Sequence, residues 1–105
     1  MKNTPQVLKA TELLGQQFMV FGTPDRPLFQ ATDIAQMLEL TNVTDMISRV
    51  DDDERSKFNL ERGGSAWFLT EFGLYEVLMQ SRKQIAKEFK NGVKNILKEI
   101  RTTGR

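Results

Sequence analysis

Six cationic side chains recur toward the C-terminal end of the chain at spacings of three and four residues. At about 100° per residue, these spacings place all six on one side of an α-helix. A row of like charges along a helix suits a polyanion, and phosphate is the obvious polyanionic ligand. The candidate phosphate-binding residues are Lys83, Lys87, Lys90, Lys94, Lys98 and Arg101, with Arg82 at the expected helix start.

The same segment carries an apolar stripe that would hold the cationic row in place. Five large apolar residues follow one another at intervals of four, four, three and four, namely Ile85, Phe89, Val93, Ile96 and Ile100. The two stripes lie about 130° apart around the helix axis. We therefore expect one long helix, with Ser81 as its cap and Gly104 as its stop signal. Gly92, in the middle of that helix, predicts a bend or a close approach to a neighbour.

The charges of the chain are divided between its two parts. Residues 82–105 hold eight Lys or Arg against two acids, which is a net charge of +6. Residues 1–81 hold seven bases against twelve acids, a net of −5, and the two parts sum to the overall +1. A lysine face that only keeps a protein in solution normally mixes both signs. Such a solvated face stays open as an alternative, but the scarcity of acids favours polyanion binding.

The composition excludes several classes of function. The 105 residues include no Cys and no His. Disulfides, thiolate zinc sites, cysteine nucleophiles and histidine chemistry are therefore excluded. The sequence has no Walker-type phosphate loop, and no general base with a pKa near neutrality is evident. We expect neither catalysis nor a cofactor.

The chain has the features of a protein of the cytoplasm. No uninterrupted apolar run approaches the roughly 20 residues that span a membrane. The N-terminal residues lack the continuous apolar core of a signal peptide. We therefore predict a single cytoplasmic domain that makes no membrane contact.

The first half of the chain predicts a hairpin followed by two short helices. Residues 17–23 and 28–30 read as paired strands around a proline-containing turn, while residues 7–15 fit either a strand or a helical turn. Thr32 or Asp33 is expected to cap a helix that ends near Leu40, and Thr41-Asn42 to open a second. A helix-turn-helix is one interpretation of this pair. The expected inner faces comprise Ile34, Ala35, Met37 and Leu38, then Val43, Met46, Ile47 and Val50.

The one acidic run, Asp51 to Glu54, could in principle supply oxygen ligands to magnesium or calcium. Consecutive acids point in different directions, however, and the run lacks the alternating spacing and the glycine of a calcium loop. We therefore predict a solvated turn and no metal site.

The second half predicts another hairpin and a buried helix. Residues 57–61 and 65–69 read as strands around a turn at Arg62-Gly63-Gly64. Thr70 is the expected cap of a helix in which Gly73 indicates close packing. A broad apolar face and the adjoining aromatics are expected to be core, not a base-stacking platform. These residues are Trp67, Phe68, Phe72, Leu74, Tyr75, Val77, Leu78 and Met79. The predicted fold is α+β, a small antiparallel sheet from two hairpins with about four helices packed on it, the last long and basic.

A series of motifs connects this chain with a known family. The segment WFLTEFGLY at residues 67–75 is followed by SRK at 81–83, AKEFK at 86–90 and IRTTG at 100–104. With the earlier segment LFQATDIA at 28–35, the series resembles the N-terminal BRO domain, found in baculovirus repeated-ORF proteins and prophage antirepressors. The resemblance implies a domain over residues 17–105, preceded by an arm or first strand at 1–16. Many members carry a tryptophan where this chain has Gly92.

The resemblance implies a nucleic-acid-binding module of viral or prophage regulation. Double-stranded DNA is then the expected partner of the cationic row, with a log–log salt slope of about −4 to −6 from five or six phosphates. Asn91, Asn95 and Arg49 are the candidates for reading bases. A second function stays open, since some members act as antirepressors on a repressor protein. In that case the domain would bind a repressor or form a homodimer, without direct DNA contact.

Overall fold

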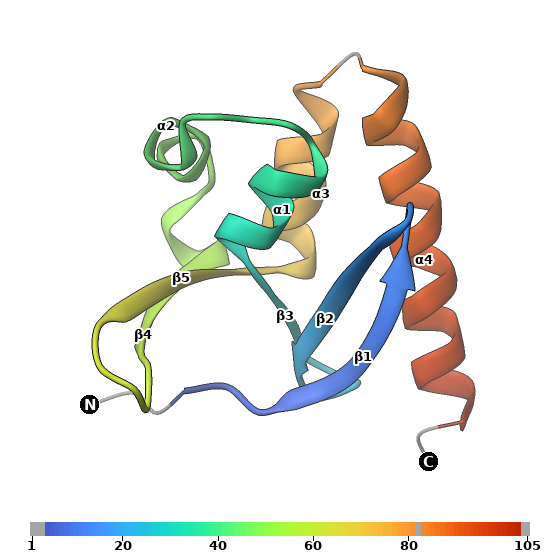
Figure 1. Cartoon of the computed structure of the whole chain (residues 1–105), viewed down its shortest axis with the longest axis horizontal. Coiled ribbons are helices and arrows are strands. Elements are labelled where there is room, and N and C mark those ends of the chain that lie inside the picture. The colour runs from blue at the N-terminus through green and yellow to red at the C-terminus, as the bar shows by residue number, and fades with distance from the viewer. Residues whose placement is uncertain (1–3, 82, 104–105) are drawn as a thin grey trace.

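Five antiparallel strands form one sheet in the spatial order β1-β2-β3-β5-β4 (Figure 1). The computed structural model describes residues 4–81 and 83–103. Antiparallel pairing of β3 with β5 joins the first three strands to the hairpin of β4 and β5. The strands are β1 (Val7–Leu13), β2 (Gln16–Gly22), β3 (Pro27–Gln30), β4 (Arg55–Asn59) and β5 (Ser65–Thr70).

Four α-helices accompany the sheet within the described residues, which confirms the α+β class and the long last helix. They are α1 (Ala31–Met37), α2 (Val43–Ser48), α3 (Glu71–Met79) and α4 (Gln84–Thr103), and a short 3₁₀ helix, η1, spans Asp52–Glu54. Figure 1 shows α4 along one outer side of the molecule, next to β1 and β2, while α1 and α3 lie together over the middle strands.

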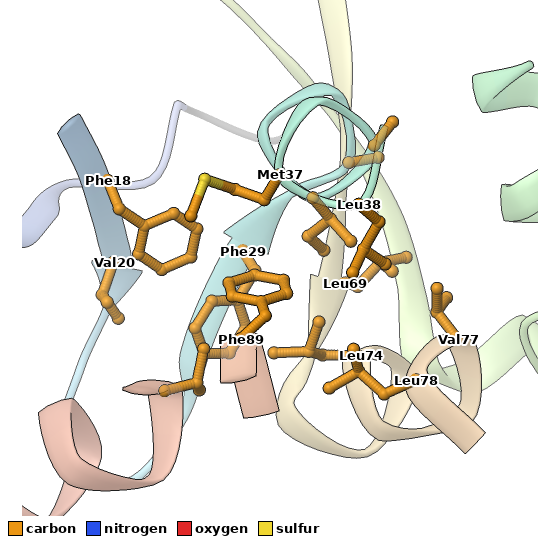
Figure 2. Close-up of a cluster of buried hydrophobic side chains, with 14 of the residues drawn as sticks. Phe18, Val20, Phe29, Met37, Leu38, Leu69, Leu74, Val77, Leu78 and Phe89 are labelled. Atoms are coloured by element: carbon orange, nitrogen blue, oxygen red, sulfur yellow. The ribbon is translucent and has the colours of Figure 1, made fainter. Parts of the chain in front are cut away.

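The hydrophobic core lies between one face of the sheet and the helices. Phe18, Phe29 and Leu69 point from three different strands into this core, where they are almost fully buried (Figure 2). The ring of Phe89 in α4 meets the ring of Phe18 edge to face at 5.4 Å, so the long helix is anchored directly on β2. Removing a ring of this kind from a core costs about 3–5 kcal/mol. The position of α4 is therefore firmly set.

Gly92 lets α4 lie close against the first strand. A Cβ built on Gly92 would stand 2.1 Å from Cδ1 of Leu13, the last residue of β1. The predicted close approach is thus present, and the side chain of Leu13 occupies the space beside the glycine. Gly73 of α3 fulfils the same expectation, since its Cβ would lie 2.6 Å from the carbonyl oxygen of Glu54.

Some element ends differ from the sequence-based prediction. The expected cap at Thr32 or Asp33 is wrong, because β3 runs directly into α1 and extended Gln30 takes the cap position. Helix α1 ends at Met37. Two residues later, Glu39 adopts a left-handed φ of 59°. Strand β4 begins and ends two residues earlier than expected, because the turn after it occupies residues 60–64. Helix α4 begins at Gln84, not after a cap at Ser81, and Gly104 lies outside the described residues.

Helix α3 is less deeply buried than its composition suggested. Phe72 and Met79 are 70% and 76% exposed, so the expectation that they belong to the core was wrong. At about 100° per residue, both lie on the side of the helix opposite Leu74 and Leu78. One helix side cannot hold all the apolar residues of so short a segment. The predicted cap is confirmed, since the Thr70 hydroxyl accepts a hydrogen bond from the Gly73 amide.

Candidate nucleic-acid interface

The apolar stripe of α4 faces the core and turns the cationic row toward solvent. Phe89, Val93, Ile96 and Ile100 are buried, and Ile85 is half-buried at the start of the helix. The six predicted cations that the structure describes are all exposed. Arg82 lies outside the described residues. One helix therefore carries its anchors on one side and a continuous cationic row on another.

Four lysines in the middle of the row have no partner among the residues that the structure describes. Among residues 4–81 and 83–103, no hydrogen bond or ion pair engages their ammonium groups. From the first to the last, they extend over about 17 Å at 1.5 Å per residue. We call these four residues the lysine row: Lys87, Lys90, Lys94 and Lys98.

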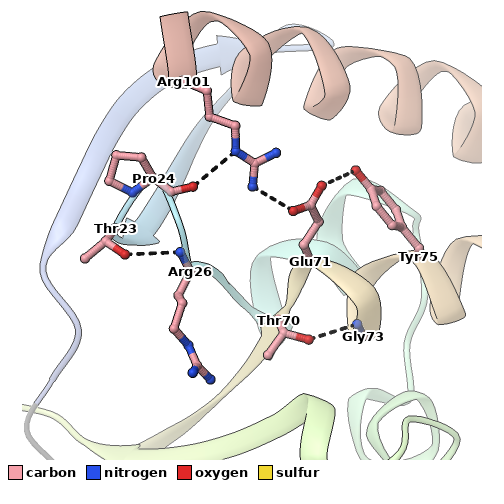
Figure 3. Close-up of polar contacts among 8 residues, drawn as sticks. All are labelled: Thr23, Pro24, Arg26, Thr70, Glu71, Gly73, Tyr75 and Arg101. Atoms are coloured by element: carbon pink, nitrogen blue, oxygen red, sulfur yellow. Dashed lines mark hydrogen bonds and ion pairs between the residues drawn. The ribbon is translucent and has the colours of Figure 1, made fainter. Parts of the chain in front are cut away.

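The C-terminal cation of the predicted set is held by the protein itself. The guanidinium of Arg101 lies 2.8 Å from Oε1 of Glu71 in α3, and its Nε donates to the carbonyl oxygen of Pro24 at 3.1 Å (Figure 3). The Tyr75 hydroxyl donates to the other carboxylate oxygen of Glu71 at 2.9 Å. Arg101 thus ties α4 to α3 and to the turn between β2 and β3.

These contacts change the ionisation of the groups around Arg101. Partial burial opposes the charge on Glu71, but the hydrogen bonds from Arg101 and Tyr75 outweigh it, so the pKa of Glu71 lies below its ordinary value. Burial, together with the hydrogen bond to the charged Glu71, raises the pKa of Tyr75 to about 12. Arg101 and Glu71 therefore form an ionised pair, and the neutral phenol of Tyr75 donates a second hydrogen bond to the Glu71 carboxylate.

The cation at the other end of α4 also has a partner. Nζ of Lys83 donates to the carbonyl oxygen of Leu38 at 3.4 Å, beside the C-terminal end of α1. Lys83 borders a groove of about 390 Å³ between α1, α2 and the end of α3. The structure thus separates the predicted set into two engaged end residues and a free lysine row.

The opposite flank of α4 faces β1. Nζ of Lys9 in β1 lies 2.7 Å from the carboxylate of Glu99. This pair compensates one of the two acids of α4, so the helix surface is more cationic than its own composition indicates. The sequence carried no signal for it, because the two residues are joined only by the fold. The link between Glu71 and Tyr75 did have a signal, their spacing of four residues.

The candidates for base reading lie in different surroundings. Asn91 and Asn95 are exposed on α4, next to the lysine row. Arg49 follows α2, and its guanidinium lies 3.2 Å from the carboxylate of Asp45. Helix α2 spans only six residues. The short helix pair therefore offers much less free cationic surface than α4.

The acidic run does not gather its carboxylates at one point. Asp52 contacts Arg55 at 2.5 Å, the amide of Asp51 donates to Glu76, and the Thr70 hydroxyl donates to Glu54. Within the described part of the chain, no group of three or more potential ligands is placed to hold a metal ion. The acids at the run's start are exposed, as expected for a solvated turn.

A comparison with protein families gives one match. The model of the BRO family N-terminal domain matches residues 17–99, from β2 almost to the end of α4. This chain belongs to the BRO family. The match includes the whole lysine row of this BRO domain and the strands and helices that position it. Searches of curated proteins and of solved structures gave no match.

Strand β1 lies wholly before the matched segment, yet it is part of the same sheet and packs against α4 through Leu13. The space next to Gly92, where many family members were expected to carry tryptophan, is taken by this strand's leucine. No helix among the described residues is long and apolar enough to span a membrane.

Proposed function

We propose that this BRO domain binds the phosphate backbone of double-stranded DNA through the lysine row of α4, as a regulatory domain of a phage or viral antirepressor. The observation that carries the proposal is the row of four exposed lysines, without partners in the described part of the chain, on a helix anchored by its other side. A lysine without a protein partner can bind a phosphate without first breaking a contact. A lysine that already has a partner must give up that contact, which reduces the net free energy of binding.

The dimensions of the lysine row suit a duplex. Its length of about 17 Å corresponds to about five base-pair steps of 3.4 Å. The contacts of the lysine row would release counterions from the phosphates and would themselves carry little information about base sequence. Lys83 and Arg101, which have partners, would contribute less than the four free lysines. Transcription control in the cytoplasm of a bacterial host follows from the proposed antirepressor role.

A mobility-shift experiment with duplex DNA, single-stranded DNA and a purified repressor tests this function. We expect the whole chain to shift duplex DNA, and the double variant Lys90→Glu/Lys94→Glu to lose most of that affinity. A matched control with the same change in net charge is Lys57→Glu/Arg62→Glu, because Figure 1 shows the hairpin of β4 and β5 on the side of the molecule away from α4. Equal losses in both double variants would reject α4 as the interface.

A specific observation favours protein binding as a second candidate function. Phe72, 70% exposed, borders a groove of about 290 Å³ in which the acids Asp25, Asp53, Glu54 and Glu71 outnumber Arg26. An exposed aromatic ring among carboxylates suits a cationic protein surface, such as that of a DNA-binding repressor. Capture of purified repressor without any duplex shift, abolished by Phe72→Ala, would favour this candidate over DNA binding.

A further inference from the structure

Three amide side chains lie along the outermost line of α4, which Thr102 and Lys98 share. Six of the described residues of α4 are buried. On a helical wheel with about 100° per residue, the mean direction of these six side chains marks the buried side of the helix, and the line along this side is the reference for the angles that follow. Gln84 and Asn91 lie about 170° from that line, and Asn95 about 150° from it. All three side chains are exposed. We call these three residues the amide crest. The six buried residues are Ala86, Phe89, Val93, Ile96, Leu97 and Ile100.

Contacts on both flanks of α4 confirm that the amide crest faces away from the domain. On one flank Arg101 contacts Glu71 of α3, and on the other Glu99 contacts Lys9 of β1. The surface between these two flanks is turned toward solvent. Figure 1 agrees, since α4 lies at the right-hand edge of the molecule with β1 and β2 beside it on its inner side.

The lysine row lies beside the amide crest, toward the α3 flank. Lys94 is about 60° from Asn91 around the axis and Lys98 only about 20°, again at 100° per residue. A phosphate strand that contacts the lysine row would therefore run along one side of α4. The amide crest would then face the groove that this strand borders, and a major groove about 12 Å wide admits an α-helix.

We propose that the amide crest reads base edges in the major groove while the lysine row holds the adjoining phosphates, an inference that rests on the proposed DNA binding. Lysines on phosphates fix position but carry no sequence information. Asparagine and glutamine, in contrast, can donate to N7 and accept from N6 of adenine at once. In this proposal, neighbouring sides of α4 bind the phosphates and read the base edges.

Asn91 and Asn95 are the strongest base readers of the crest. They are about 6 Å apart along the axis, close to two base-pair steps. Neither amide has a hydrogen-bond partner among the described residues, so both donors and acceptors are available. Arg49, the third candidate from the sequence, follows α2 and is paired with Asp45. We therefore expect a preference for sites that contain adenines two steps apart.

Selection from a randomised duplex library tests the inference with the whole chain. The wild type should enrich an adenine-containing motif and bind it about 5-fold to 150-fold more tightly than a scrambled duplex, the range for one good bidentate contact. Asn91→Ala/Asn95→Ala should lose most of this preference, yet keep its affinity for the scrambled duplex and the salt dependence of that affinity. Alanine raises helix propensity at exposed positions, so the variant should fold.

Gln36→Ala, which removes an exposed amide from α1, is the matched control and should keep both preference and affinity. An unchanged motif in the Asn91/Asn95 variant overturns the inference. Salt-dependent binding of all duplexes alike by the wild type overturns it too, while the phosphate contact of the lysine row stands. If the wild type binds no duplex at any salt concentration, the inference and the proposed function fail together.

Discussion

The guanidinium of Arg101 lies 2.8 Å from the carboxylate of Glu71, and this pair joins the end of the long helix to the start of the preceding one. Arg101 had been predicted to contact DNA, as the last cation of its row. In the structure it holds α4 at a fixed angle to α3 and to the turn at Pro24. We infer that its main effect on the proposed DNA binding is indirect, through the position of the lysine row.

The first prediction concerns Glu71→Gln and pH. The folded-state pKa of Glu71 is lowered, so its charge stabilises the fold above the ordinary value of 4.5 and this stabilisation is lost as the pH falls through the lower folded-state value. Glu71→Gln should therefore reduce the free energy of unfolding by about 1 kcal/mol at pH 7. The difference from the wild type should shrink below pH 4.5. Urea unfolding of both proteins across this range measures it, and a difference independent of pH would contradict the ionised pair.

The second prediction concerns Tyr75, the single tyrosine of the chain. Burial and the neighbouring Glu71 raise its pKa to about 12, so the folded protein should be favoured below the unfolded value near 10 and lose this contribution between pH 10 and 12. The phenolate absorbance of the folded protein should rise with a midpoint near 12, and at a lower pH in Glu71→Gln, where burial of the phenol still keeps its pKa above the ordinary value. Circular dichroism monitors the fold during the titration. A wild-type midpoint near 10 with the fold intact would exclude the described hydrogen bond.

The third prediction concerns the contact between Gly92 and Leu13. An alanine Cβ at position 92 would stand 2.1 Å from Leu13 Cδ1. The clashing atom is the end of the Leu13 side chain, which can relieve the contact by turning, so the cost of that movement should roughly offset the gain of about 1 kcal/mol in helix propensity and leave stability almost unchanged. In a Leu13→Ala background the same substitution should stabilise the protein by about 1 kcal/mol instead. Thermal unfolding of the four proteins in this cycle measures the coupling, and additive effects would show that β1 does not contact the helix there.

Local patterns in the sequence predicted most of the elements of this fold. The periodicity of α4 was sufficient to predict the helix and its two stripes, because the buried residues and the cations repeat over many turns. An error of a few residues at the helix start therefore did not change which residues share a side. The cap at Thr70 and the turn glycines were recognisable for a similar reason, since each acts on its immediate neighbours. The cap expected at Thr32 failed because β3 passes into α1 without a linker. No local signal marks a junction of that kind.

The parts of the candidate site that could not be predicted depend on contacts between distant segments. Arg101 is 30 residues from Glu71, and nothing in its spacing distinguished it from the free lysines. Lys9 and Glu99 meet only because β1 lies against α4. Phe72 was assigned to the core from its apolar character, although helix geometry turns it outward. The free lysine row and the amide crest became distinguishable only once the buried side of α4 was known.

The salt dependence of duplex binding tests the central claim most directly. Binding constants of the wild type, measured over a range of salt concentrations, should give a log–log slope of about −4, from four lysines at about 0.9 each. In Lys90→Glu/Lys94→Glu the slope should be shallower by about two, with affinity reduced about equally on all sequences. A slope near zero for the wild type, or an unchanged slope in this variant, would contradict phosphate binding by the lysine row.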